Sequence, residues 1–302
     1  MAELCLGTVQ FGMRYGINNR DGQPVEGQCF EMLDMAAQNG LRFLDTARAY
    51  GTAELVLGEY FKAGKNAGQF KVISKLRPNI IEENEKDVRG VIQRECENTL
   101  SRLGITCLDG YLCHTPEYIY KSEIIDALRN LKEQKLVSNI GISIYSLKEG
   151  WAALDKNLDY IQLPYNIFDQ RGIQQGFIKQ AKQAGITVFA RSPFLQGLLL
   201  MEKERVPEYL KHAVPYLVKF EKITEKFHID KAEMLIRFVL GERDIDFMVF
   251  GVDTKEQLRQ NMENAKKGAL PDEIMQEIKD CFVDLEEGIL IPSLWSNGRK
   301  AE

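Results

Sequence analysis

Short apolar segments alternate with amphipathic stretches along almost the whole chain. These segments are too short for helices, and most lack a clean alternation of apolar and polar side chains. That pattern is typical of parallel strands covered by helices. Eight segments therefore predict strands: Leu4–Val9, Arg42–Asp45, Phe70–Ser74, Leu108–Cys113, Ser138–Ser143, Tyr160–Leu163, Thr187–Ala190 and Phe247–Phe250.

The stretches between these segments predict helices, and several of them end at a glycine, the residue that most readily terminates a helix. The gap from Gly197 to Ile245 contains two helical patterns and predicts an extended loop over one end of the fold. A polar tail follows Ser296. The predicted helices include Gly27–Asn39, Thr52–Lys62, Glu85–Leu103, Glu123–Gln134, Gln174–Ala184, Lys231–Leu240 and Pro271–Leu285.

Eight strands, each followed by a crossover helix, predict a (β/α)8 TIM barrel. No linker or low-complexity segment divides residues 1–302, so we expect a single domain. The alternative is an open doubly wound sheet. That fold usually carries Gly-x-Gly-x-x-Gly after its first strand, and this fingerprint is absent here.

Composition narrows the range of partners. The chain is 44% hydrophobic and 27% charged, with a formal net charge of -5, which argues against a nucleic-acid or membrane-surface role. No secretory signal is visible, and no apolar run approaches the roughly 20 residues of a membrane span. The six cysteines lack framework spacing, so we expect reduced thiols in a cytoplasmic protein.

Side chains of types that can take part in catalysis lie where successive predicted strands end. The second strand ends at Asp45 with Tyr50 in the following loop, the third leads into Lys75, and the fourth leads into His114. In a barrel these strand ends share one mouth, so we expect the four side chains to meet there. Each also has a structural alternative: a helix cap, a half-buried aromatic, a solvated lysine or a core histidine.

The segment from Asp45 to Gly51, Asp-Thr-Ala-Arg-Ala-Tyr-Gly, resembles the active-site segment of the aldo-keto reductases. The resemblance extends over nearly the full length of the chain and implies a catalytic tetrad of Asp45, Tyr50, Lys75 and His114. In that chemistry Tyr50 donates a proton to the alkoxide formed by hydride transfer to a carbonyl. We expect Lys75 to lower the pKa of Tyr50, Asp45 to hold Lys75, and His114 to orient the carbonyl. No metal is expected, because His212 and His228 lack ligand spacing.

The resemblance also implies an extended nicotinamide dinucleotide across the barrel mouth. Ser143 and Gln162 would hold the carboxamide, and Arg191 would pack on the nicotinamide ring. The strand-1 end contributes Gly7 and Thr8. The strand-7 loop contributes Ser192, Phe194, Leu195 and Gly197 at the pyrophosphate, and the strand-8 loop and helix contribute Gly251, Asp253, Lys255, Gln257 and Asn261 at the adenosine end.

Three positions depart from the family pattern. Ile144 replaces an asparagine beside the carboxamide, Arg191 replaces the commoner stacking tyrosine, and Gly251 replaces a lysine that reaches the 2'-phosphate. Asp253 would repel that phosphate, whereas Lys255 or Arg259 could replace the lysine. We favour NADP(H), because most relatives with this tetrad use it, and NAD(H) is the alternative.

The expected activity is reduction of an aldehyde or ketone, with a small-molecule carbonyl compound as substrate and sugar-like compounds among the candidates. One alternative is a non-catalytic NADP-binding regulatory module, and another is a barrel aldolase with a Schiff base on Lys75. We expect Arg48 to contact substrate. The rest of the pocket wall is expected from Val9–Tyr15, Tyr165–Phe168 and the loop after Gly197. The sequence does not predict an oligomeric state.

Overall fold

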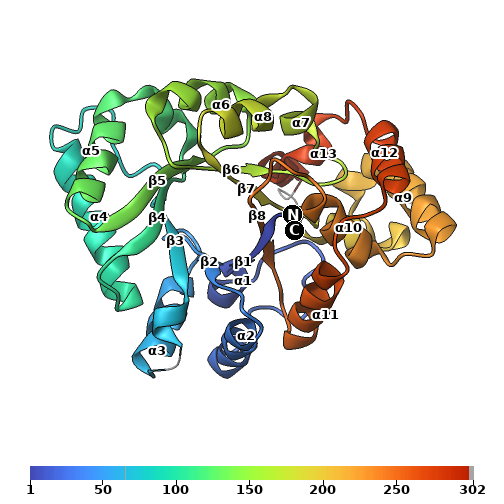
Figure 1. Ribbon diagram of the computed structural model, residues 1–302, viewed down its shortest axis with the longest axis horizontal. Helices are drawn as coiled ribbons and strands as arrows, with labels where there is room; N and C mark the ends of the chain where they lie inside the picture. Colours follow the sequence, from blue (N-terminus) through green and yellow to red (C-terminus); the bar gives the residue numbers. More distant parts are fainter. Residues whose placement is uncertain (65, 299–302) are drawn as a thin grey trace.

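The computed structural model describes residues 1–64 and 66–298. Eight parallel strands pair in sequence order and close into a barrel, with helices arranged around the outside (Figure 1). The predicted (β/α)8 barrel is therefore confirmed. The strands are β1 Glu3–Gly7, β2 Phe43–Asp45, β3 Lys71–Leu76, β4 Leu108–Cys113, β5 Val137–Ser143, β6 Tyr160–Pro164, β7 Thr187–Arg191 and β8 Phe247–Gly251.

The helices pack their apolar sides on the barrel. In α5, for example, Ile124, Leu128 and Leu131 recur at helical spacing and are buried. The α-helices are α1 Val9–Gly12, α2 Glu26–Gln38, α3 Ala53–Lys62, α4 Val88–Leu103, α5 Ser122–Glu133, α6 Leu147–Ala153, α7 Arg171–Gln174, α8 Phe177–Gln183, α9 Val214–Phe227, α10 Lys231–Leu240, α11 Lys255–Lys266, α12 Asp272–Cys281 and α13 Glu287–Leu290. Short 3-10 helices are η1 Ala67–Gln69, η2 Pro116–Tyr120, η3 Leu154–Lys156, η4 Leu195–Leu200, η5 Lys203–Arg205, η6 Glu208–Ala213 and η7 Pro292–Gly298.

The element boundaries differ from the predicted ones in a few places. The first strand stops at Gly7, and Val9 instead begins α1. The helix predicted over 174–184 is interrupted at Gly176, whose φ of 72° ends α7 before α8 begins. The helix predicted over 271–285 is shorter and is followed by α13, and the expected polar tail lies partly in η7 and partly outside the described residues.

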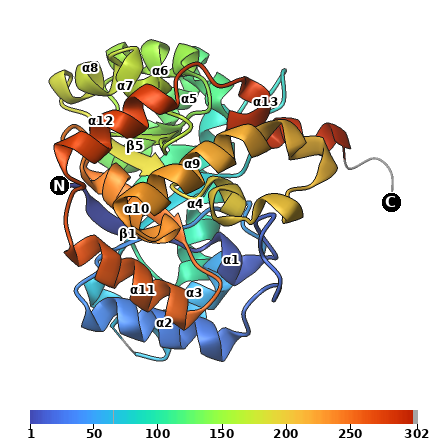
Figure 2. The same ribbon diagram turned by 90° about the vertical axis from the view of Figure 1, so that its right-hand side faces the viewer.

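The long β7–β8 connection contains the two predicted helices, α9 and α10, preceded by η4, η5 and η6. Figure 2 shows α9 beside α10 and α12 on one side of the barrel. None of the helices formed by the described residues is both long and apolar enough to cross a membrane.

Strand periodicity places the polar residues inside the barrel mouth. An apolar cluster fills the barrel interior and includes Cys5, Phe43, Ile73, Leu112, Tyr160, Phe189 and Val249. Side chains two residues apart on a strand point to the same face. The next inward positions, at the carboxyl ends of the same strands, are therefore Gly7, Asp45, Lys75, His114, Gln162, Arg191 and Gly251.

Candidate active site

Lys75 joins the candidate catalytic residues into one hydrogen-bonded group. Its ammonium nitrogen lies 2.7 Å from both carboxylate oxygens of Asp45 and 3.1 Å from the hydroxyl oxygen of Tyr50. It also donates to the backbone oxygen of Thr46 at 3.0 Å. Lys75 is fully buried and Asp45 is 2% exposed, so the structure does not support the alternatives of a helix cap and a solvated lysine.

Close backbone contact with α1 holds the loop that carries Tyr50. Thr52 donates its backbone N–H to the oxygen of Gly12 at 3.1 Å. A Cβ on Gly12 would lie 1.8 Å from the backbone oxygen of Tyr50, and one on Gly51 would lie 2.2 Å from the oxygen of Gly12. Gly51 also has a φ of 56°, which disfavours other residues. Both glycines are therefore required for the observed position of Tyr50.

A buried carboxylate that the sequence analysis missed fixes α3 against β3. Glu54, 2% exposed, accepts hydrogen bonds from the hydroxyls of Ser74 at 2.8 Å and Thr99 at 3.1 Å. Ser74 directly precedes Lys75, and Glu54 follows the Tyr50 loop. This contact therefore helps to set the spacing between Tyr50 and Lys75. A buried glutamate is unusual, but an amphipathic pattern alone does not reveal its burial.

The pKa of Tyr50 moves opposite to the expected direction. Burial and the Asp45 carboxylate raise this pKa well above 10, although Arg191 acts to lower it. Lys75 contacts the Tyr50 hydroxyl but does not bring the net pKa below its ordinary value, because burial and the Asp45 carboxylate dominate. The bidentate contact with Asp45 offsets only part of the favourable effect of the Lys75 charge on a Tyr50 phenolate. Tyr50 stays protonated at neutral pH, as a proton donor must.

His114 is a neutral imidazole beside Tyr50. The two ring centroids lie 5.8 Å apart in an edge-to-face arrangement. Burial, followed by the charges of Lys75 and Arg191, lowers the pKa of His114 to about 3. Its Nδ1 is buried and has no hydrogen-bond partner within the described part of the chain. A neutral histidine there can hydrogen-bond a substrate oxygen without introducing a charge.

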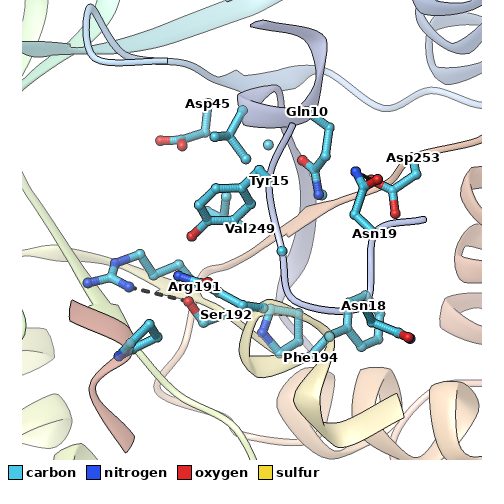
Figure 3. A pocket seen from close by; sticks show the side chains of 18 of the residues that line it. Gln10, Tyr15, Asn18, Asn19, Asp45, Arg191, Ser192, Phe194, Val249 and Asp253 are labelled. Carbon is cyan, nitrogen blue, oxygen red and sulfur yellow. Dashed lines mark hydrogen bonds between the residues drawn. The ribbon is translucent and has the colours of Figure 1, made fainter. Parts of the chain in front are cut away.

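A cavity of about 530 Å³ extends from this group across the barrel mouth. Figure 3 shows Asp45 and Arg191 toward one side of it and Asp253 with Asn19 toward the other. Asp45, Tyr50 and His114 line it, whereas Lys75 lies behind them. Most of the residues expected to bind a cofactor also line it: Gly7, Ser143, Arg191, Ser192, Phe194, Gly197, Gly251, Asp253, Gln257 and Asn261.

Four of the expected cofactor residues do not line this cavity. The Thr8 hydroxyl donates to the backbone oxygen of Asp45 at 3.0 Å, and Leu195 is fully buried. Gln162 lies behind the surface, where its amide nitrogen donates to Asp45 at 2.8 Å. Lys255 instead pairs with Glu31 on α2.

The expected pocket wall was partly wrong. Val9, Gln10 and Tyr15 line the cavity, but Arg48 does not. The expectation for 165–168 also fails, because Tyr165 is buried and stacks on Phe238 with ring centroids 5.4 Å apart. Additional lining residues that the pattern did not identify are Asn18, Asn19, Tyr145, Gln196, Ala232, Val249, Gln260, Pro292 and Ser293.

The residues near the tetrad fit a nicotinamide carboxamide. Ser143 is the register partner of Gln162, on neighbouring strands. Because the Gln162 amide nitrogen binds Asp45, its oxygen is oriented elsewhere, and that oxygen is buried without a hydrogen-bond partner among the described residues. A carboxamide N–H is the kind of donor that it lacks. Ile144 is buried and apolar, so its side chain offers no further hydrogen bond.

The described residues also show whether side chains are placed to bind a metal ion. Across residues 1–64 and 66–298, no group of three or more His, Cys, Asp or Glu side chains is arranged to hold a metal ion.

Arg191 is the only lysine or arginine among the described residues that line the cavity. Its guanidinium carbon lies 4.3 Å from the centroid of the Tyr145 ring, and Nη2 donates to the Ile144 backbone oxygen at 3.1 Å. The side chain is only partly exposed, so these contacts fix a planar cation beside the tetrad.

Comparisons with known proteins agree with this geometry. A model of the aldo/keto reductase family matches residues 3–282. The uncharacterized oxidoreductase YrpG of Bacillus subtilis is 26% identical, with 93% of this chain and 92% of that protein covered. The aldo-keto reductase YhdN of Bacillus subtilis is 25% identical over 78% of each chain. Among solved structures, an aldo-keto reductase of Bacillus halodurans in its holo form superposes with a TM-score of 0.74 at 21% identity, over 93% of this chain and 92% of that one. At that identity the superposition shows the fold alone.

Proposed function

The chain belongs to the aldo/keto reductase family and is an oxidoreductase, and on that premise we propose that it reduces a small aldehyde or ketone to an alcohol, with the reverse oxidation also open to it. The observation that carries this proposal is the contact of one buried lysine with both Asp45 and Tyr50. A Schiff-base lysine would instead need a free amine, and the Lys75 ammonium is fully engaged. An aldolase role is accordingly not supported.

Each member of the tetrad has a separate task in this reaction. A bound nicotinamide cofactor supplies the hydride. Tyr50 donates its proton to the alkoxide oxygen, a stronger base than the phenolate it leaves behind. Lys75 then stabilises that phenolate from 3.1 Å, and Asp45 keeps Lys75 in position. Neutral His114 donates a hydrogen bond that orients the carbonyl beside Tyr50.

Family membership supports a nicotinamide cofactor. Lys255 and Arg259 were the candidates to replace the lysine that Gly251 displaces at the 2'-phosphate. Lys255 pairs with Glu31 and Arg259 pairs with Glu263 at 2.8 Å. Neither lines the cavity. The structural argument for NADP(H) is thereby lost, and the choice between the two dinucleotides depends on the charges that the cavity itself presents.

The substrate end of the cavity is polar, with Tyr15, Tyr145 and Arg191 close to the tetrad. A planar guanidinium offers several fixed donors to hydroxyl or carboxylate oxygens. We therefore propose a polyhydroxylated or anionic carbonyl compound, in agreement with the sugar-like substrate that the sequence suggested.

The test is turnover. The purified protein is mixed with NADH or NADPH and a panel of aldehydes, ketones and keto-sugars, and loss of the reduced-nicotinamide absorbance is followed, with substrate-free reactions as the control. We expect substrate-dependent oxidation with at least one member of the panel. Tight cofactor binding with no turnover across the whole panel would instead favour the non-catalytic nucleotide-binding module.

A further inference from the structure

In the described part of the chain, the side of the cavity away from the tetrad is lined by uncharged polar residues and one carboxylate, Asp253. Its neighbours in the cavity wall are Asn19, Gln257, Gln260 and Asn261. Figure 3 shows Asp253 facing Asn19, on the opposite side of the cavity from Arg191. The single carboxylate therefore dominates the local charge at this end.

Hydrogen bonds from two segments hold Asp253 in place. The Asn19 side-chain amide donates to its carboxylate at 2.8 Å, although the two residues are 234 positions apart in the sequence. Asn19 is itself fixed, because it exchanges hydrogen bonds with the backbone of Gly22 at 2.7 and 3.0 Å. The backbone N–H of Asp253 donates to the Gln257 side chain at 2.7 Å. The carboxylate is consequently part of a preformed wall.

Among the residues that the structure describes, no lysine or arginine at this end of the cavity offsets the Asp253 carboxylate. The two candidates, Lys255 and Arg259, are engaged with Glu31 and Glu263 outside it. Burial, and after it the neighbouring Asp21 charge, raises the pKa of Asp253, so these surroundings already disfavour negative charge. This end of the cavity thus repels a second anion.

The N-terminus of α11, the helix that follows Asp253, does not offset the negative charge of this carboxylate. A helix N-terminus attracts anions through its free N–H groups. At the start of α11, however, the Gln257 N–H donates to the Thr254 hydroxyl at 3.2 Å, and Glu256 adds another negative charge in the first turn. Both features weaken the attraction of this terminus for a phosphate.

We infer that Asp253 makes this chain select NADH over NADPH, by accepting hydrogen bonds from the adenosine ribose hydroxyls and repelling a 2'-phosphate in the same place. This inference rests on the proposed use of a nicotinamide dinucleotide. A phosphate monoester carries nearly two negative charges at neutral pH. A carboxylate that binds ribose hydroxyls is the equivalent device in NAD-binding Rossmann folds, on an unrelated architecture.

The experiment measures binding, without a carbonyl substrate. Dissociation constants for NADH and NADPH are determined by isothermal titration calorimetry at low salt. The same titrations with adenosine 5'-monophosphate and adenosine 2',5'-bisphosphate isolate the effect of the 2'-phosphate. For the wild-type protein we expect NADH to bind at least about tenfold more tightly than NADPH, with the difference shrinking as salt is raised.

Two variants connect this preference to one side chain. Asp253→Asn keeps the size and hydrogen-bonding groups of the residue but removes its charge, so we expect the NADH preference to fall at least about fivefold. Glu123→Gln is the matched control, because it removes an exposed first-turn charge of another helix, α5, that does not line the cavity. It should leave the ratio within about twofold.

Several results would overturn the inference. Wild-type binding of NADPH as tightly as NADH would do so without any variant. An unchanged ratio in Asp253→Asn, or an equal change in both variants, would remove Asp253 as the discriminating group. Binding of neither dinucleotide would overturn the proposed function itself, and the inference with it, so the two failures can be told apart.

Discussion

Asp45 and Lys75 form a bidentate ion pair inside the barrel mouth, with the ammonium nitrogen 2.7 Å from each carboxylate oxygen. Their side chains are 3% and 0% exposed, respectively. A buried charge without a partner costs several kcal/mol, so each residue depends on the other. The pair also fixes the environment of Tyr50, whose hydroxyl touches Lys75.

Lys75→Met should therefore damage both stability and activity. It leaves Asp45 as an unpaired buried carboxylate, which lowers the free energy of unfolding by about 3 kcal/mol and removes the charge that stabilises the Tyr50 phenolate. Urea unfolding measures the first effect and steady-state turnover the second. The double variant Asp45→Asn, Lys75→Met should be more stable than Lys75→Met while remaining inactive. A single variant as stable as the wild type would contradict the account of the pair.

His114 should make stability fall in acid. Its pKa is about 3 in the folded protein and about 6.5 in an unfolded chain. Between those values the unfolded state binds the extra proton, so the free energy of unfolding decreases as the pH falls, by at most about 1.4 kcal/mol per pH unit. From pH 7 to pH 5 the wild type should lose up to about 2 kcal/mol more than His114→Gln. Equal losses in the two proteins would show that His114 is not held neutral.

Gly12→Ala should displace Tyr50 without touching the cofactor side of the cavity. The new Cβ would lie 1.8 Å from the Tyr50 backbone oxygen, so the loop must move. We expect turnover to fall by about a hundredfold, because small misplacement of a catalytic group has effects of that size. Gly27→Ala in α2 is the control, since its Cβ meets nothing within 4 Å and should raise stability by about 0.5 kcal/mol. Full activity in Gly12→Ala would show that this contact does not position Tyr50.

Arg191 should determine the preference for anionic substrates. It is the only lysine or arginine among the described residues that line the cavity, so Arg191→Gln should raise KM at least about fivefold more for carboxylate-bearing aldehydes than for neutral ones. Arg48→Gln is the control, because Arg48 does not line the cavity. If both variants changed the two substrate classes equally, Arg191 would have no anion-binding role.

The sequence predicted the barrel well because its signals are local and periodic. Short apolar segments and amphipathic helices recur along the chain, and a residue such as Asp45 at a strand end needs only the barrel rule to be placed at the mouth. Side chains two residues apart on a strand point to the same face, so Lys75 points into the barrel like the buried Ile73.

The features of the site that could not be predicted from the sequence depend on contacts between distant segments of the chain. Asn19 meets Asp253 across 234 positions, and no periodicity encodes such a pair. The direction of the Tyr50 pKa depends on how deeply the hydroxyl is buried and on how close Asp45 lies, and no periodicity encodes either. Arg48 was expected at the cavity from its position between Asp45 and Tyr50, but a short loop can direct a long side chain either way.

The central claim is that Tyr50 is the proton donor of a carbonyl reduction, and Tyr50→Phe tests it most directly. The variant removes only the hydroxyl that contacts Lys75, and the other cavity residues remain. With a substrate identified in the turnover panel, kcat should fall by about 10²–10⁴-fold while the dissociation constant of the cofactor stays within about threefold. Retention of more than about a tenth of wild-type kcat would contradict the claim.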